Sequence, residues 1–163
     1  MMQPGAVASP SQLVRVLKVL SIAMMCSLVI YLVAAVIMNE MNGPLMVDLN
    51  NYHTTLLAVV MLIAFACLVI GKRVMAKGIG NAKNSLNPLE AKLNIYRGAF
   101  IINLALLEVP GWLTLTVYLL TGSFPFLALA AVLLGLMIAT WPGVKRISSQ
   151  LELDWNDQQL LNK

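Results

Sequence analysis

Long runs of hydrophobic residues dominate the chain, and most polar residues are gathered between them. Each run approaches the roughly 20 residues that an α-helix needs to cross about 30 Å of hydrocarbon. The runs lack the strict alternation of apolar and polar positions that is typical of membrane β-strands. They therefore predict four transmembrane helices, over residues 14–38, 54–71, 97–120 and 124–141.

The segments between these runs are polar and carry turn signals. Residues 39–53 and the turn at 121–123 connect spans on one side of the membrane, and residues 72–91 connect them on the other side. Within this last linker, residues 78–81 (Gly-Ile-Gly-Asn) are expected to be flexible. The four spans are therefore expected to form two helical hairpins.

The third span is expected to begin before it enters the membrane. Asn87 followed by Pro88 is a helix start signal, with Asn87 as the N-cap and Pro88 at the first helical position. A helix from Pro88 to about Leu120 would be about 50 Å long, so its first turns would extend beyond the hydrocarbon. Pro110 lies inside this helix and removes a backbone donor, which predicts a kink.

Composition agrees with lipid as the surrounding solvent. Of 163 residues, 60% are hydrophobic and 11% are charged, whereas a soluble domain is about 25% charged. These values exclude a soluble enzyme, a disordered chain and a disulfide scaffold. Cys26 and Cys67 lie inside apolar runs and are interpreted as small buried hydrophobic residues. The expected fold is an all-α membrane protein.

The positions of the basic residues predict its orientation. All eleven Lys and Arg residues lie before the uninterrupted apolar run that begins at about Val19, between residues 72 and 97, or after the fourth span. Short loops rich in Lys and Arg stay in the cytoplasm, so both termini, the 72–91 linker and a short tail over 147–163 are expected inside. This also explains the net charge of +4 without nucleic acid. The residues expected to anchor the chain at the membrane interfaces are Lys72, Arg73, Tyr96, Arg97, Trp112, Trp141, Lys145 and Arg146.

Glu108 is the only charged residue deep inside a predicted span. A charge near the bilayer midplane costs about 3 kcal/mol on insertion scales, so this side chain must be protonated, paired or turned toward the bundle interior. Carbonyl groups freed at Pro110, beside a carboxylate, resemble the broken-helix ion sites of transporters. Glu108, Asn103 and Pro110 are therefore a candidate buried proton or ion site.

A structural role for Glu108 is the alternative. In a helical bundle its carboxyl group can hydrogen-bond to Ser21, Ser27, Thr114 or Thr116 on a neighbouring helix or subunit. Small residues in the spans would permit close contacts between helices; they are Ala34, Ala35, Ala64, Ala66, Ala128, Ala130, Ala131 and Gly135. Under this hypothesis Glu108 helps to hold helices together.

No catalytic or cofactor motif accompanies these features. The chain has no HExxH, GxSxG, Walker or CxxC motif, and we expect neither enzymatic activity nor a cofactor or metal site. His53 is interpreted as a capping or surface residue, with a loose cation site formed with Glu40 and Asp48 as the alternative. A short helix at about 154–161, on the membrane surface or frayed, is expected in the tail.

Part of the chain resembles a known group of proteins. The stretch from Lys92 to Glu108, the Leu-Leu-Thr-Gly sequence at 119–122 and the Leu-Glu-Leu sequence at 151–153 resemble small four-span membrane proteins of Bacteroidetes-like bacteria without assigned function. This resemblance implies a bacterial inner membrane location. Two hairpins with one buried carboxylate are also similar, in structure alone, to the proteolipid ring subunit of V-type ATPases, whose carboxylate lies on the fourth span.

The sequence therefore predicts a non-enzymatic inner membrane protein that works through helix packing. Its expected partners are the lipid bilayer and either further copies of itself or a larger membrane complex. The alternative is a proton- or cation-translocating element centred on Glu108.

Overall fold

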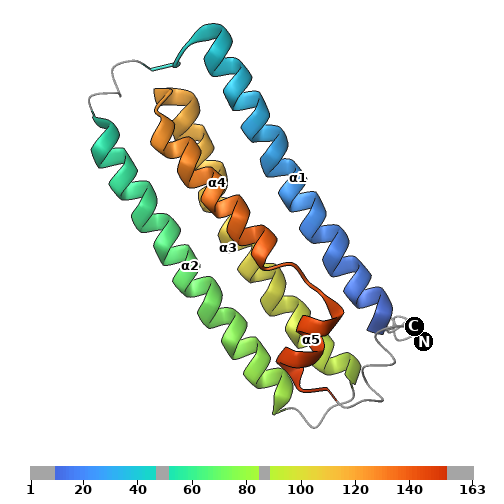
Figure 1. Cartoon of the computed structure of the whole chain (residues 1–163). Coiled ribbons are helices and arrows are strands. Elements are labelled where there is room, and N and C mark those ends of the chain that lie inside the picture. Colours follow the sequence, from blue (N-terminus) through green and yellow to red (C-terminus); the bar gives the residue numbers. More distant parts are fainter. Residues whose placement is uncertain (1–9, 47–51, 85–88, 154–163) are drawn as a thin grey trace, which may run out of the picture.

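The protein is built from helices in every part of the chain that the structure describes. The computed structural model describes residues 10–46, 52–84 and 89–153. Its helices are α1 (Pro10–Asn42), α2 (His53–Lys83), α3 (Leu89–Thr121), α4 (Phe124–Ala139) and α5 (Val144–Leu151). Figure 1 shows α1 to α4 running roughly alongside one another, with α5 at one end.

Several of these helices are long and apolar enough to cross a membrane. α1, α2 and α3 each meet this condition alone, and α4 with α5 would count as a fourth span if this pair, bent by 72°, is one broken span. The long helix predicted over residues 88–120 is present as α3. The prediction of an all-α membrane protein is confirmed at this level.

α3 lies at the centre of the bundle. α1, α2 and α4 each pack along it, whereas α1 and α2 barely contact each other in the part of the chain that the structure describes. The predicted second hairpin is thus closely packed, with only residues 122–123 between α3 and α4. In the first hairpin, both helices are held by α3 instead of by each other.

α2 corrects the expectation of a flexible linker after the second span. The helix continues through the basic residues as far as Lys83, and Gly78 and Gly80 are inside it. Packing explains the first of these: Gly78 is buried against α3, where an added Cβ would overlap the Cβ of Ala99. The loss of helix propensity at glycine, about 1 kcal/mol, is offset by this close approach of α2 to α3.

α1 and α3 end in the same way, at the end of the bundle opposite α5 (Figure 1). Gly43 and Gly122 follow them with φ angles of 71° and 66°, the left-handed conformation that glycine adopts without steric cost. Their amides donate to the carbonyl oxygens of Asn39 and Tyr118. Asn39 Nδ2 also donates to Tyr118 O at 2.9 Å, which ties α1 to α3 at this end.

α5 was not expected from the sequence. It packs on the bundle through Ile147 and Leu151, which are 0% and 4% exposed. It covers Tyr96, whose hydroxyl donates to Gln150 Oε1 at 3.0 Å. Tyr96 is only 1% exposed, so its side chain lies inside the bundle, and its role as a membrane-interface anchor stays a prediction. Leu153, just after α5, is also buried.

Two helix predictions fall on parts of the chain that the structure does not describe. They are the N-cap at Asn87 with Pro88 and the short helix at about 154–161.

Basic residues are concentrated at the α5 end of the bundle. They lie in the first half of α1, the second half of α2, the start of α3 and α5, segments that Figure 1 shows together at one end. The other end has no Lys or Arg among the residues described there. The arrangement of the helices therefore places the basic segments of the sequence together at one end of the bundle.

Candidate functional site

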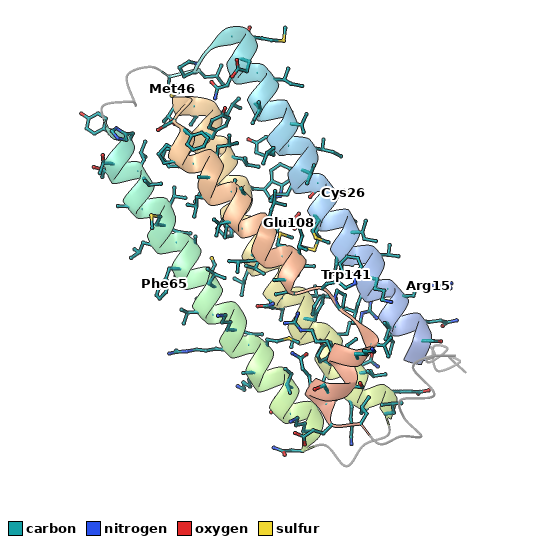
Figure 2. The ribbon with its side chains drawn as sticks, viewed as in Figure 1. Arg15, Cys26, Met46, Phe65, Glu108 and Trp141 are labelled. Atoms are coloured by element: carbon teal, nitrogen blue, oxygen red, sulfur yellow. The ribbon has the colours of Figure 1, made fainter. Side chains whose placement is uncertain are left out.

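A row of polar and aromatic side chains joins α1 to α3 near the middle of both helices. Ser27 Oγ donates to Glu108 Oε1 at 2.8 Å, and Trp112 Nε1 approaches the same oxygen at 3.4 Å. The rings of Tyr31 and Trp112 stack with their centroids 4.5 Å apart, and Tyr31 Oη lies 3.0 Å from Thr116 Oγ1. We call these five residues the α1/α3 seam. Figure 2 shows Glu108 near the middle of the bundle.

Helical periodicity brings these residues together. Ser27 and Tyr31 are four residues apart on α1, as are Glu108, Trp112 and Thr116 on α3, so each set lies on one helix face. Gly111 then lets the two helices approach, because an added Cβ would lie 2.8 Å from Leu28 Cδ1.

The Ser27 hydroxyl group has two hydrogen-bond acceptors within reach. Its hydroxyl is 2.8 Å from Glu108 Oε1 and 2.8 Å from Met24 O, yet a hydroxyl has a single hydrogen to donate. When Glu108 is ionised, Ser27 can donate to it. When Glu108 is protonated, the carboxyl can donate to Ser27 Oγ while Ser27 donates to Met24 O. The same geometry accommodates both forms of the acid.

Glu108 is only half-buried and forms no ion pair with a residue that the structure describes. The next residue, Val109, is 58% exposed, and Trp112 is 39% exposed, so the acid borders a strip of α3 that faces outward. The only ion pair among the described residues joins Lys83 to Glu152, far from the seam. In an isolated chain this carboxyl group would therefore border lipid with two hydrogen-bond donors but no positive charge.

The structure separates Asn103 from Glu108. Asn103 lies against α2, where its Oδ1 would be 2.6 Å from a Cβ added to Gly71, whereas Glu108 bonds to α1. Pro110 is buried within α3, which remains helical across it, and its carbonyl oxygen accepts a hydrogen bond from Thr114 Oγ1 at 2.6 Å. The three residues proposed as one buried site therefore do not converge on a single point.

Of the four hydroxyl partners proposed for Glu108, Ser27 is the one that bonds to it. Ser21 Oγ donates to Leu17 O of its own helix, as Thr114 does to Pro110. Thr116 belongs to the seam, but it donates to Trp112 O and contacts Tyr31. Tyr31 was not among the predicted site residues, and Trp112 was predicted only as an interface anchor. The i, i+4 spacing is the signal that could have linked them to Ser27 and Glu108.

Comparison of the chain with protein-family models, with curated proteins and with solved structures found no match.

The remaining candidate residues are not brought together in the part of the chain that the structure describes. The described residues contain no group of three His, Cys, Asp or Glu side chains close enough to hold a metal. His53 Nε2 lies 3.2 Å from Thr54 Oγ1, and Asp48 is outside the described residues. Cys26, expected to be buried, is exposed, and Cys67 is half-buried.

A double-mutant cycle tests the hydrogen bond across the seam. Ser27→Ala is expected to lower the free energy of unfolding by about 1 kcal/mol, because the half-buried Glu108 carboxyl group loses a hydrogen-bond donor. In a Glu108→Leu background, Ser27→Ala should cost much less, because the acceptor is already absent. The measurement is unfolding in mixed detergent micelles. Ser21→Ala is the control, since Ser21 bonds within its own helix; equal coupling of both serines to Glu108 would contradict the assignment.

Proposed function

We propose that the protein is a four-span membrane protein that acts without catalysis, by packing against other membrane proteins through the α1/α3 seam. The partner surface is a second copy of the chain or a subunit of a larger complex. In this proposal α4 completes the set of spans, and the basic end with α5 lies in the cytoplasm, as the positive-inside rule favours. The resemblance of the second hairpin to small four-span bacterial proteins supports the bacterial inner membrane as the location.

The half-buried position of Glu108, beside exposed residues of α3, is the observation that carries this proposal. A charged side chain at the level of the bilayer centre is costly, about 3 kcal/mol on insertion scales. Here the acid is half-buried beside the exposed Val109 and Trp112, without a cation to offset its charge. A second protein surface over this strip would remove the carboxyl group from lipid and bury the exposed part of Trp112.

Cysteine cross-linking in native membranes tests the proposal. In a background of Cys26→Ser and Cys67→Ser, we expect Val109→Cys to cross-link efficiently. Leu62→Cys is the matched control, because Leu62 is 72% exposed on α2 near the middle of its predicted span. A product of twice the chain mass would identify self-assembly, and a larger product would identify a complex. Equal cross-linking at both positions, or none at Val109, would contradict the proposal.

The second candidate function is proton or cation translocation centred on Glu108. The position of the Ser27 hydroxyl between Glu108 and Met24 O favours it, because this hydroxyl can turn from one acceptor to the other when Glu108 gains or loses a proton. Asn103 faces α2 and has no part in such a relay. The kink predicted at Pro110 would supply the mobility of α3.

Proton flux into proteoliposomes under an imposed potential distinguishes the two functions. For translocation, wild-type flux should exceed that of empty liposomes and Glu108→Gln should abolish it while the protein stays folded. Glu90→Gln, in the first turn of α3, is the control for removing a carboxylate. For the packing function, neither variant changes flux, and Glu108→Gln reduces cross-linking at Val109→Cys instead.

A further inference from the structure

A second site lies at the basic end, on the side of α3 that faces α2. A pocket of about 330 Å³ opens there between α2, α3, α4 and α5. Most of its wall is apolar, contributed by residues such as Leu68, Met75 and Leu107. It contains no residue of the α1/α3 seam, so whatever binds there is independent of the function proposed above.

Asn103 is the most deeply placed polar group of this pocket. The residue is 9% exposed and lines the cavity, and its side chain has no hydrogen-bond partner among the described residues. Gly71 makes room for it on α2. A polar group of a bound molecule would supply this amide with a partner that the largely apolar wall does not.

Two cations lie at the same pocket. Lys72 and Arg146 line it, and none of the described residues that line it is acidic. Arg146 Nη1 donates to Ala139 O, which holds the guanidinium group at the C-terminal end of α4. Ammonium and guanidinium groups together favour an anion with several oxygen acceptors, such as a phosphate.

The pocket continues as an apolar groove between α2 and α4. Leu68 and Leu136 line both the pocket and the groove, and Phe65 and Val132 belong to the groove beyond them. The groove reaches Met61, and the helix from Lys72 to Met61 spans about 16 Å. This is close to half of a hydrocarbon core of about 30 Å, the depth that the acyl chains of one leaflet occupy.

We propose that this site binds one anionic phospholipid from the leaflet at the basic end. The phosphate accepts hydrogen bonds from Lys72 and Arg146, and Asn103 Nδ2 donates to an ester or glycerol oxygen. One acyl chain lies in the groove between α2 and α4. The occupant is a lipid and not free phosphate, because the groove adjoining the cations is apolar and matches a chain in length.

Native mass spectrometry of the full chain in mild detergent tests the proposal with phosphatidylglycerol and phosphatidylcholine. The wild type should prefer the anionic lipid. Lys72→Gln with Arg146→Gln should weaken phosphatidylglycerol binding by about tenfold or more, since charge-assisted hydrogen bonds are lost. Arg73→Gln with Lys145→Gln removes the same charge from neighbouring positions outside the pocket and should leave the preference intact. Equal losses in both double variants, or no preference in the wild type, would overturn the proposal.

A block in the groove tests the acyl chain separately. Leu68→Trp fills the junction of pocket and groove and should weaken binding of both lipids, whereas Leu62→Trp, on the exposed face of α2, should not. Soluble glycerol phosphate should fail to displace the lipid at equal concentration. If glycerol phosphate competes as well as the lipid, or if Leu68→Trp binds lipid as the wild type does, the acyl chain does not occupy the groove. Leu68→Trp leaves Lys72 and Arg146 in place. It therefore tests the lipid site even if the charge variants do not fold.

Discussion

Replacing Gly78 with leucine is expected to push α2 away from α3 and to lower the free energy of unfolding by about 3 kcal/mol. The reason is that even a Cβ at this position would overlap the Cβ of Ala99. Ala99 has no longer side chain that can rotate away, so the helices themselves must move. The measurement is unfolding in mixed detergent micelles, followed by far-UV circular dichroism.

Gly80 is the matched control for this prediction. It lies two residues further along α2, and a Cβ added there meets nothing within 4 Å. Gly80→Leu should therefore leave stability unchanged or raise it by up to about 1 kcal/mol, because leucine favours a helix over glycine. If Gly78→Leu and Gly80→Leu are equally stable, Gly78 does not pack closely against Ala99, and the close approach of α2 to α3 at this position is refuted.

The helices were predictable because their signals are local. The apolar runs and the Thr-Gly-Ser turn at 121–123 already mark most of α3 and its connection to α4. The extension of α2 was not predictable in this way. Gly71 and Gly78 have the same low helix propensity whether they end a helix or pack inside it, and only their contacts with Asn103 and Ala99 on α3 distinguish the two cases.

The small residues also show that the sequence alone does not reveal which positions form helix contacts. Of those expected to allow close helix contacts, Ala35, Ala64 and Ala130 are buried, whereas Ala34, Ala66, Ala128, Ala131 and Gly135 are exposed. Composition shows which residues permit close packing, but it does not show which face of a uniformly apolar helix meets another helix.

The candidate site was predictable in its central residue and in one partner. Glu108 stands out because a charge inside an apolar run is rare, and Ser27 was among its proposed partners. Tyr31 was missed because an aromatic residue in such a run is equally compatible with lipid contact. Asn103 and Glu108 were grouped because both are polar, although five residues on a helix place them about 140° apart.

Replacing Ile147 with aspartate is expected to release α5 from the bundle. Ile147 is 0% exposed, and burying an unpaired carboxylate there would cost several kcal/mol. An eight-residue helix is not stable alone in water, so α5 should unfold locally while α1 to α4 stay helical. Hydrogen–deuterium exchange should then show loss of amide protection over residues 144–151. Ser149→Asp, on the exposed side of α5, is the control.

Release of α5 is also expected to weaken binding at the proposed lipid site. Arg146 lies on α5 and lines the pocket, so Ile147→Asp should reduce the preference for phosphatidylglycerol even though it removes no basic residue. Lys72 remains in place, and the loss should therefore be smaller than in Lys72→Gln with Arg146→Gln. Protection of 144–151 that survives Ile147→Asp would show that α5 does not depend on this side chain. A released α5 with an unchanged lipid preference would show that Arg146 takes no part in binding.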